Sequence, residues 1–233
     1  MKRSAIFLLI VAFTICIMGC VIAQGVEEQN REVTSFNGIS VSTGIKLFLT
    51  QGENNHVVVK ADGAIIDDVV TEIENGTLKI YVSARKLIRL NSSFEVFVTF
   101  SWINSIESAA GSEVIGQNKF MVDKLAVKNS SGSSSNFEVE CRDLELHTSS
   151  GSIIKTRGTS LNLIAKTSSG SEIKARELEV IGAKLDASSG STIEVQVCGD
   201  LEATASSGAS ISYYGDANPK LLQQSSGGSI KKR

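Results

Sequence analysis

Residues 148–154 read Thr-Ser-Ser-Gly-Ser-Ile-Ile, and residues 167–173 read Thr-Ser-Ser-Gly-Ser-Glu-Ile. The Ser-Ser-Gly triplet occurs six times in the second half of the chain, and Ala109-Ala110-Gly111 precedes these as a degenerate copy. The seven glycines are separated by 21, 19, 19, 20, 18 and 19 residues, and they are Gly111, Gly132, Gly151, Gly170, Gly190, Gly208 and Gly227. A period near 20 residues indicates one short structural unit that is stacked on copies of itself.

Apolar residues alternate with polar ones on both sides of each glycine. Five residues before the glycine stand Ile106, Val127, Leu146, Ala165, Leu185, Ala203 and Leu222, and three residues after it stand Val114, Ile154, Ile173, Ile193, Ile211 and Ile230. Such a period of two predicts strands with one buried face. In the 21-residue copy we expect the pattern to slip by two residues, so that Phe137 and Val139 take the buried places.

Each unit therefore contains a strand, a Ser-Ser-Gly-Ser corner and a second strand. Glycine suits the corner because the backbone there needs a positive φ or room for a tight bend. One unit cannot bury its own apolar face, whereas stacked units align like side chains above each other. The sequence predicts an all-β, single-stranded parallel β-helix, a solenoid with coils of about 19–20 residues over residues 106–231. Helical repeats are excluded because no copy has apolar residues at helical spacing.

The preceding residues, 33–105, show the same alternation less regularly. Ser42-Thr43-Gly44 resembles a further corner, and Asn75-Gly76 is a strong turn signal between two short apolar runs. Most aromatic residues lie in this part of the chain, which we expect to form an irregular, wider or capping end of the solenoid. Trp102 stands where the irregular part meets the regular repeats, and we expect it to pack in the core there rather than to form a platform on which a sugar stacks.

The N-terminal residues have the pattern of a secretory signal. Lys2 and Arg3 precede an apolar run that is shorter than a membrane-spanning helix requires. Cleavage after Ala23 would remove residues 1–23. A second reading is a lipoprotein signal that ends at residue 19, because Ile17-Met18-Gly19-Cys20 resembles a lipobox and would make Cys20 the lipidated N-terminus. We therefore expect an exported protein in the periplasm, at the outer membrane or on the cell surface, with a lipid anchor only in the second reading.

Charge and cysteine spacing narrow the function further. The chain carries 23 basic and 25 acidic residues without a basic stripe, which argues against nucleic acid as a partner. Cys141 and Cys198 belong to coils three apart, roughly 14 Å for stacked strands, so no intramolecular disulfide is expected. We expect both to be small, buried and unpaired.

Candidate catalytic residues do not form a motif. Carbohydrate-active β-helix enzymes use clustered carboxylates, and the acids considered are Asp123, Glu138, Glu140, Asp143, Glu172, Asp186, Glu194, Asp200 and Asp216. None stands in a tight Asp-x-Asp pattern, and dispersed charges on solvent-facing strand positions explain them. His56 and His147 are 91 residues apart and lack a partner motif. We therefore expect no catalytic residue, no metal site and no cofactor. The aligned serines are better explained by a corner that requires small residues than by a site that binds ordered water or the hydroxyls of a sugar.

Residues 33–231 resemble the head GIN domain family, whose members are labelled auto-transporter adhesins. The matching pieces are Phe36-x-x-Ile39-x-Val41, Gly44-Ile45-x-Leu47-x-Leu49-x-Gln51-Gly52, Asn75-Gly76-Thr77-Leu78-x-Ile80 and the recurrent Ser-Ser-Gly-Ser corners. The resemblance implies an exported protein of Bacteroidetes-type bacteria, a right-handed parallel β-helix and no established enzymatic activity.

Two classes of function remain open from the sequence. The first is a non-catalytic envelope module, adhesin-like or a scaffold, which recognises a glycan, a protein or another copy of itself along the solenoid side. The alternative is a carbohydrate-active enzyme on a β-helix scaffold, which requires a groove where several acids and a basic residue converge. A third idea is an envelope-stress or scaffold component anchored through Cys20.

Overall fold

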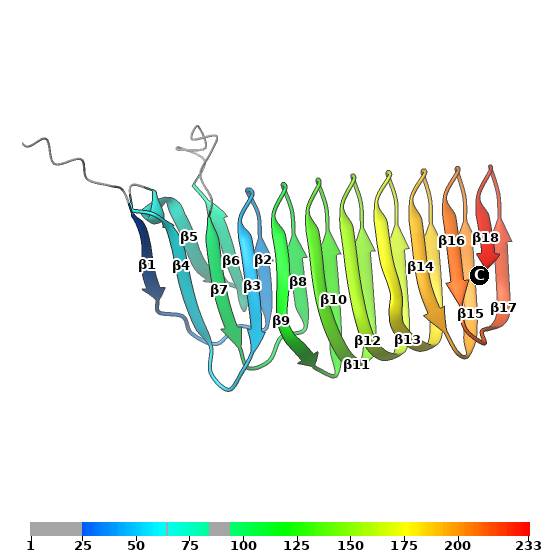
Figure 1. The fold of residues 1–233 in the computed structure, drawn as a ribbon, viewed down its shortest axis with the longest axis horizontal. Coiled ribbons are helices and arrows are strands. Elements are labelled where there is room, and N and C mark those ends of the chain that lie inside the picture. Colours follow the sequence, from blue (N-terminus) through cyan, green and yellow to red (C-terminus); the bar gives the residue numbers. More distant parts are fainter. Residues whose placement is uncertain (1–24, 64, 84–93) are drawn as a thin grey trace, which may run out of the picture.

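The chain forms a β-solenoid, seen from the side in Figure 1. The structure is a computed structural model that describes residues 25–63, 65–83 and 94–233; Cys20 and the signal sequence lie outside this range. Over these residues the chain forms 18 strands in one continuous sheet and one short 3-10 helix, η1 (Ile66–Asp68). No helix among the described residues is long and apolar enough to cross a membrane.

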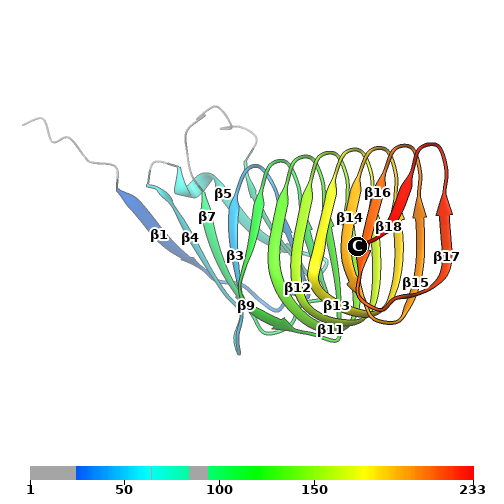
Figure 2. The same cartoon turned by 45° about the vertical axis from the view of Figure 1, so that its right-hand side comes forward.

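The continuous sheet folds over into two faces that enclose the core (Figure 2). Apart from the antiparallel strands at the N-terminal end, strands of face A run towards the Ser-Ser-Gly corners, and strands of face B run away from them. Face A contains, in spatial order, β5 (Val69–Glu74), β6 (Thr77–Val82), β2 (Gly38–Val41), β8 (Ser105–Ser108), β10 (Lys124–Asn129), the second parts of β11 (Ser134–Thr148), β12 (Ile153–Thr167) and β13 (Glu172–Ala187), then β15 (Asp200–Ala205) and β17 (Asn218–Gln224).

Face B continues the same coils on the other side of the corners. It contains β1 (Val26–Arg31), β4 (His56–Asp62), β7 (Glu95–Phe100), β3 (Lys46–Gln51), β9 (Glu113–Met121), the first parts of β11, β12 and β13, then β14 (Thr192–Val197), β16 (Ser210–Tyr214) and β18 (Ser229–Lys232). The long strands β11, β12 and β13 bend from face B into face A at the edge opposite the corners, which we call the lower edge.

The corners have one backbone conformation. The residue before each corner glycine and the glycine itself both have positive φ, for example 54° at Ser150 and 68° at Gly151. The following residue closes the turn, since the Ser152 amide donates to the Ser149 carbonyl at 3.3 Å. This is the arrangement of a tight turn with two left-handed central residues. A Cβ on Gly151 would meet no atom within 4 Å, so backbone conformation rather than space favours glycine there.

Backbone hydrogen bonds join successive corners into a ladder. The Gly151 amide donates to the Ser169 carbonyl of the next coil at 3.1 Å, and the equivalent bond from Gly170 to Ser189 measures 3.0 Å. The same bond recurs at the other corners from Gly44 to Gly208. Each corner therefore satisfies the amide of its neighbour, and the turns stack in strict register along one edge.

The serine that follows most corner glycines points inward and is buried. The Ser152 hydroxyl donates to the Asn129 carbonyl of the preceding coil at 2.9 Å, and that of Ser133 donates to the Ser108 carbonyl at 2.8 Å. Because both serines are at most 1% exposed, these bonds offset the cost of placing a hydroxyl inside the solenoid. The fourth residue of the Ser-Ser-Gly-Ser pattern is thus part of the interior.

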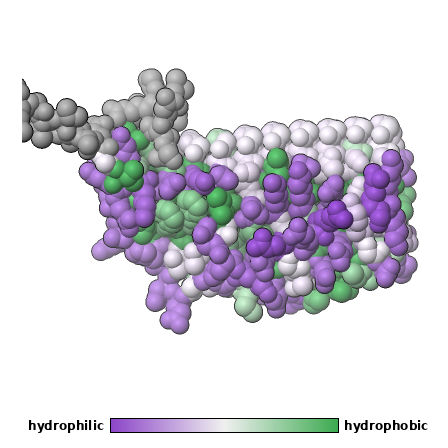
Figure 3. Space-filling model, viewed as in Figure 1, coloured by the Kyte–Doolittle hydropathy of each residue, from purple (hydrophilic) through white to green (hydrophobic). Residues whose placement is uncertain are grey.

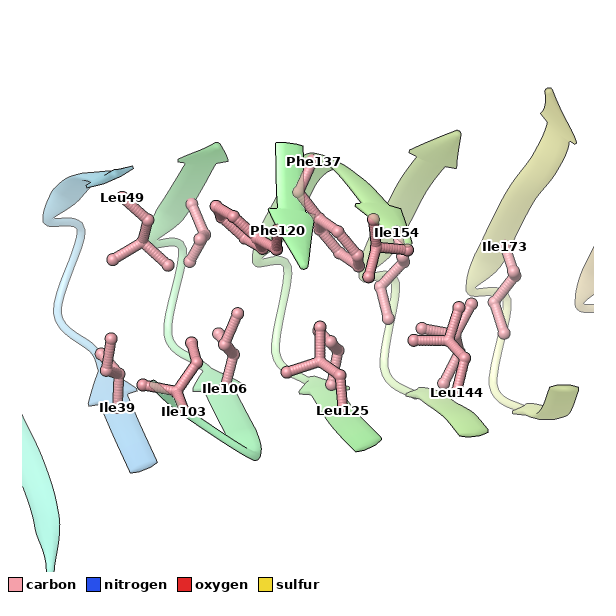
Figure 4. Close-up of a cluster of buried hydrophobic side chains, with 14 of the residues drawn as sticks. Ile39, Leu49, Ile103, Ile106, Phe120, Leu125, Phe137, Leu144, Ile154 and Ile173 are labelled. Carbon is pink, nitrogen blue, oxygen red and sulfur yellow. The ribbon is translucent and has the colours of Figure 1, made fainter. Parts of the chain in front are cut away.

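Below the corners the core is a double column of apolar side chains. Figure 4 shows Leu49, Phe120, Phe137, Ile154 and Ile173 from face B opposite Ile39, Ile106, Leu125 and Leu144 from face A. All of these side chains are at most 2% exposed. The interior residues of successive coils therefore lie above each other in register, as the alternating sequence pattern predicts.

Phe137 and Val139 are buried as expected, but the slip in register expected at the 21-residue copy is wrong. Phe137 pairs with Thr156 rather than with Ile154, and Ser135 holds the place beside Ile154. The two extra residues form a bulge in β9 between Ile115 and Lys119, so the next coil keeps its register. Ser135 tolerates the buried place because its hydroxyl donates to the Asn129 side chain at 2.9 Å.

The N-terminal end departs from sequential stacking. Strands β2 and β3 lie between β6–β7 on one side and β8–β9 on the other, although β6 and β7 follow them in the chain. Beyond this point the outer strands β1, β4 and β5 pair antiparallel. The front aromatics are divided: Phe100 is fully buried, whereas Phe48 and Phe97 stack outside face B at 4.6 Å.

Candidate binding surfaces

The candidate acids do not converge on one centre. Glu138 pairs with Arg157 at 3.0 Å, Glu140 with Lys119 at 3.3 Å, and Asp200 with Lys220 at 3.4 Å. Glu172 and Glu194 stand beside Thr192 and Lys174 of adjacent coils, not beside each other. Asp186 and Asp216 lie elsewhere along the chain. The described residues contain no group of His, Cys, Asp or Glu side chains that could hold a metal ion.

Two pairs of candidate acids each share one cation: Glu138 and Glu140 lie 4.0 Å and 3.3 Å from the Lys119 ammonium, and Asp123 and Asp143 share Arg142. Arg142 at the lower edge contacts both carboxylates at 3.1 Å. The pKa of Asp143 lies below its ordinary value, first because the Asn162 amide donates to it at 2.8 Å and second because of the Arg142 hydrogen bond. A depressed carboxyl pKa is typical of an ion pair and opposite to what a general acid needs. The cluster of Arg142, Asp123 and Asp143 therefore stabilises the bend between the two halves of β11.

The two histidines lie in separate places. His56 is exposed at the start of β4 and faces Thr99 of β7 in the sheet. His147 is half-buried on the outer side of face A, where its Nε2 lies 2.6 Å from the Glu145 carboxylate. Among the residues that the structure describes, neither histidine is hydrogen-bonded or ion-paired to a second histidine or an aspartate.

An apolar groove follows the lower edge. It has a volume of about 770 Å³, and we call it the lower groove; its lining includes Trp102, Met121, Asp123, Glu140, Cys141, Arg142, Leu161, Glu179 and Ile181. Trp102, Met121, Leu161 and Ile181 are 49%, 63%, 54% and 55% exposed. Figure 3 shows apolar surface at several points along this edge within a mostly polar side. Exposed apolar side chains with a polar rim are typical of an interaction surface.

Two expectations fail at this groove. Trp102 does not pack in the core; it is half-exposed, because Ile103 rather than Trp102 fills the interior place beside it. Cys198 is exposed, because it follows the buried Val197 at the outward bend next to Ile181. Cys141 is buried as expected, and both thiols are free. Burial raises the pKa of the Cys141 thiol above its ordinary value.

Sequence reasoning missed Leu161 and Ile181, the centre of the lower groove. Their signal is a break in the alternation at the bend: Leu161 directly follows the buried Ser160, and Ile181 directly follows the buried Val180, and in each case two residues rather than one lie between that buried residue and the next. Within an alternating pattern an apolar residue out of phase must point to the solvent.

A second, polar groove runs beside the corners on face A. It has a volume of about 520 Å³, and we call it the corner groove; its lining includes Glu107, Lys128, Ser130, His147, Ser149, Lys166, Ser168, Asp186 and Ser188. Both grooves run along the stack of coils, so each is built from several repeats rather than from one loop.

These features define a β-solenoid module with elongated side surfaces. A family model described as "Putative auto-transporter adhesin, head GIN domain" matches residues 35–217. The chain belongs to this family, which confirms the resemblance seen in the sequence. The family suggests an adhesin-like, exported or surface protein.

Solved structures show the same fold. A putative adhesin from Bacteroides fragilis has a TM-score of 0.81 at 16% identity, with 91% of this chain and 98% of that chain covered. A putative adhesin from Parabacteroides merdae gives 0.72 at 15%, covering 89% and 96%. A putative lipid binding protein from Parabacteroides distasonis gives 0.65 at 17%, covering 91% and 98%. No curated protein sequence matches the chain.

Proposed function

We propose that this chain is a non-catalytic, adhesin-like module of the cell envelope that binds a protein surface through its lower groove. The single observation that carries the proposal is the set of four large apolar side chains that are about half exposed along one edge. Trp, Met and Arg are enriched where proteins meet, and Arg142 lies among these side chains.

The chemistry of the groove favours a protein over a sugar. Leu161, Ile181 and Met121 are aliphatic and offer no hydrogen bonds, whereas a sugar needs polar partners across most of its surface. Burying the exposed part of one such side chain contributes about 1 kcal/mol or more, at 25 cal/mol per Å². The lining is acidic, because it contains three carboxylates, Asp123, Glu140 and Glu179, and one cation, Arg142. An acidic lining suits a partner whose apolar surface is flanked by basic residues.

The non-catalytic part of the proposal is supported by the acids. Glu138, Glu140 and Asp200 each have a basic partner, and Asp123 and Asp143 share Arg142. The carbohydrate-active enzyme remains the alternative, and it needs a second carboxylate across a sugar-sized gap from the first. Release of reducing ends from a polysaccharide panel by the purified protein would overturn the non-catalytic proposal.

The binding test uses the described part of the chain, residues 25–233, on arrays of extracellular proteins and of glycans. We expect retention on specific proteins, and we expect Leu161→Glu with Ile181→Glu to abolish it. The matched control is Ile164→Glu, because Ile164 is 40% exposed in the same coil as Leu161 but lies on face A outside the groove. Equal loss in the control, or unchanged retention in the double variant, would contradict the lower groove as the contact surface.

We further propose that residues 33–231 act as one exported unit, released by cleavage after residue 23 or anchored by a lipid on Cys20. An acyl chain holds a protein on a membrane without spanning it. The test is Cys20→Ser in the full chain, followed by membrane fractionation of the producing cells. Unchanged partitioning would rule out the anchor and leave the cleaved, unanchored form.

A further inference from the structure

We propose that the corner groove binds a linear acidic polysaccharide that carries a carboxylate on every second sugar. This site is separate from the lower groove, lies on the opposite edge of the coils and takes a different class of ligand. It is therefore a second binding activity rather than a restatement of the first.

The shape of the corner groove fits a linear ligand. One wall is a single column of outward side chains in register, namely Glu107, Lys128, His147, Lys166 and Asp186, contributed by β8, β10, β11, β12 and β13. The other wall consists of the corner serines Ser130, Ser149, Ser168 and Ser188. With coils about 4.8 Å apart, the column extends over roughly 19 Å. A ligand that fills it must be extended and nearly straight.

The hydrogen-bonding groups of this groove repeat with the coils. Each coil from that of Lys128 to that of Asp186 presents one corner serine hydroxyl and one long polar or charged side chain, whereas Ala109 stands in the place of the serine in the coil of Glu107. A pyranose unit in an extended glycan advances its chain by about the same distance as one coil advances the solenoid. Successive sugars therefore meet equivalent groups, which is what a glycan with many hydroxyls needs. No aromatic or aliphatic side chain larger than Ala109 lines the groove, so an apolar peptide or acyl chain finds no partner.

The charges in the column select an acidic sugar at alternate positions. Lys128 and Lys166 are two coils apart, roughly 10 Å, with His147 between them. Lys166 has no ion-pair partner among the described residues, and the Lys128 ammonium lies 3.6 Å from Glu107, with both side chains more than half exposed. Both ammonium groups can therefore turn to a ligand carboxylate. The imidazole of His147, held by Glu145 at 2.6 Å, faces the intervening neutral sugar.

Two acids limit the site. Glu107 and Asp186 lie at opposite ends of the column and repel further carboxylates there. The groove thus accommodates about two acidic sugars with their neutral neighbours, and a polymer with a carboxylate on each sugar places charges beside these acids as well. Recognition consequently depends on the alternation and not only on total negative charge.

The test measures binding of residues 25–233 to three probes by titration calorimetry at low salt. Hyaluronan oligosaccharides carry a carboxylate on every second sugar, chitin oligosaccharides carry none, and oligogalacturonates carry one on each sugar. We expect the tightest binding to hyaluronan oligosaccharides and weaker binding as salt rises, because exposed charges are screened. Equal affinity for the neutral chitin oligosaccharides, or no binding of hyaluronan oligosaccharides, would overturn the proposal.

Variants locate the site. Lys128→Gln and Lys166→Gln should each weaken hyaluronan binding up to about fivefold, and together up to about 25-fold. Ser168→Phe should abolish binding without a change of charge by filling the groove. The matched control is Lys155→Gln, since Lys155 is exposed in the same coil as Lys166 but on face B. Thermal unfolding at the wild-type midpoint shows that each variant is folded.

The outcomes separate the two binding proposals. The Leu161→Glu and Ile181→Glu double variant should bind hyaluronan oligosaccharides as the wild type does, while it loses retention on proteins. An unchanged affinity in the Lys128 and Lys166 double variant would refute the corner groove and leave the lower groove untouched.

Discussion

Two glycines near the same coil place different demands on the chain, and replacing each by alanine separates these demands. Gly170 is a corner glycine with a φ of 66°, and a Cβ there meets no atom within 4 Å. Gly158 lies within β12 with a φ of 115°, and a Cβ there would stand 2.0 Å from the Val139 carbonyl oxygen. The first change therefore affects conformation only, whereas the second also pushes two backbone strands apart.

The magnitudes follow from these contacts. A left-handed conformation costs an L-residue about 1–2 kcal/mol, and a less flexible unfolded chain offsets part of this, so Gly170→Ala should lower the free energy of unfolding by about 1 kcal/mol. At Gly158 the strands must separate by about 1 Å to reach even a 3.0 Å contact. Loss of two ladder hydrogen bonds and added backbone strain make Gly158→Ala cost about 3–5 kcal/mol.

Urea unfolding followed by circular dichroism gives both free energies, and thermal unfolding should show midpoints lower by about 2–4 °C for Gly170→Ala and by about 6–20 °C for Gly158→Ala. Asparagine is the discriminating control because it tolerates positive φ. Gly170→Asn should be milder than Gly170→Ala, while Gly158→Asn should be at least as damaging as Gly158→Ala. Equal losses at the two positions would refute the distinction between conformational and steric demand.

Four further experiments test other parts of the fold. Ser150→Asn should raise the free energy of unfolding by about 0.5–1 kcal/mol, because Ser150 has a φ of 54° and asparagine before glycine suits such a turn; an unchanged urea midpoint would contradict this. Asn129→Ala should cost about 2 kcal/mol in urea unfolding, since it removes the partner of the buried Ser135 hydroxyl and of the Ile153 carbonyl; Asn129→Thr with Ser135→Ile, the residues of the next coil, should cost less. Cys198 should react with iodoacetamide much faster than Cys141 in peptide mapping, and equal rates would contradict their different burial. The pKa of Cys141 is raised in the fold, so its neutral thiol contributes stability that is fully present below the ordinary thiol pKa of 9.0. This contribution is lost as the pH rises from 9.0 through the higher pKa of the folded state. Cys141→Ala should remove that pH dependence from the urea midpoint.

The repeat made the solenoid predictable because each level of the sequence agrees with the others. The spacing of the corner glycines sets the coil, the alternation around Leu146 and Ile154 sets the buried face, and the turn residues fit the corner. The 21-residue copy was misjudged because its excess could be placed before or after Phe137. A bulge in β9 is decided by the packing of three phenylalanines, with Phe120 and Phe137 centroids 6.0 Å apart, and local pattern carries no such information.

The binding surfaces were less predictable for a physical reason. An outward side chain has no alternation to fix its neighbours, so the column from Lys128 to Lys166 is visible only once the registers of successive coils are known. Trp102 was misplaced because a large aromatic usually lies inside, and nothing in the sequence shows that Ile103 takes the interior place. The lower groove could not be predicted either, because its lining residues come from several coils and meet only when these coils are stacked.

The strands β2 and β3 lie between strands that follow them in the chain, and this has a consequence for how coil number can change. Strands cannot be added to or removed from this end one coil at a time, because β2 and β3 are hydrogen-bonded on both sides to strands that follow them in the chain. The regular coils beyond it carry no such constraint, and each is joined to the next by the same corner bond. Duplication or deletion of one 19-residue segment there would lengthen or shorten the rod by a single step, and both side grooves with it.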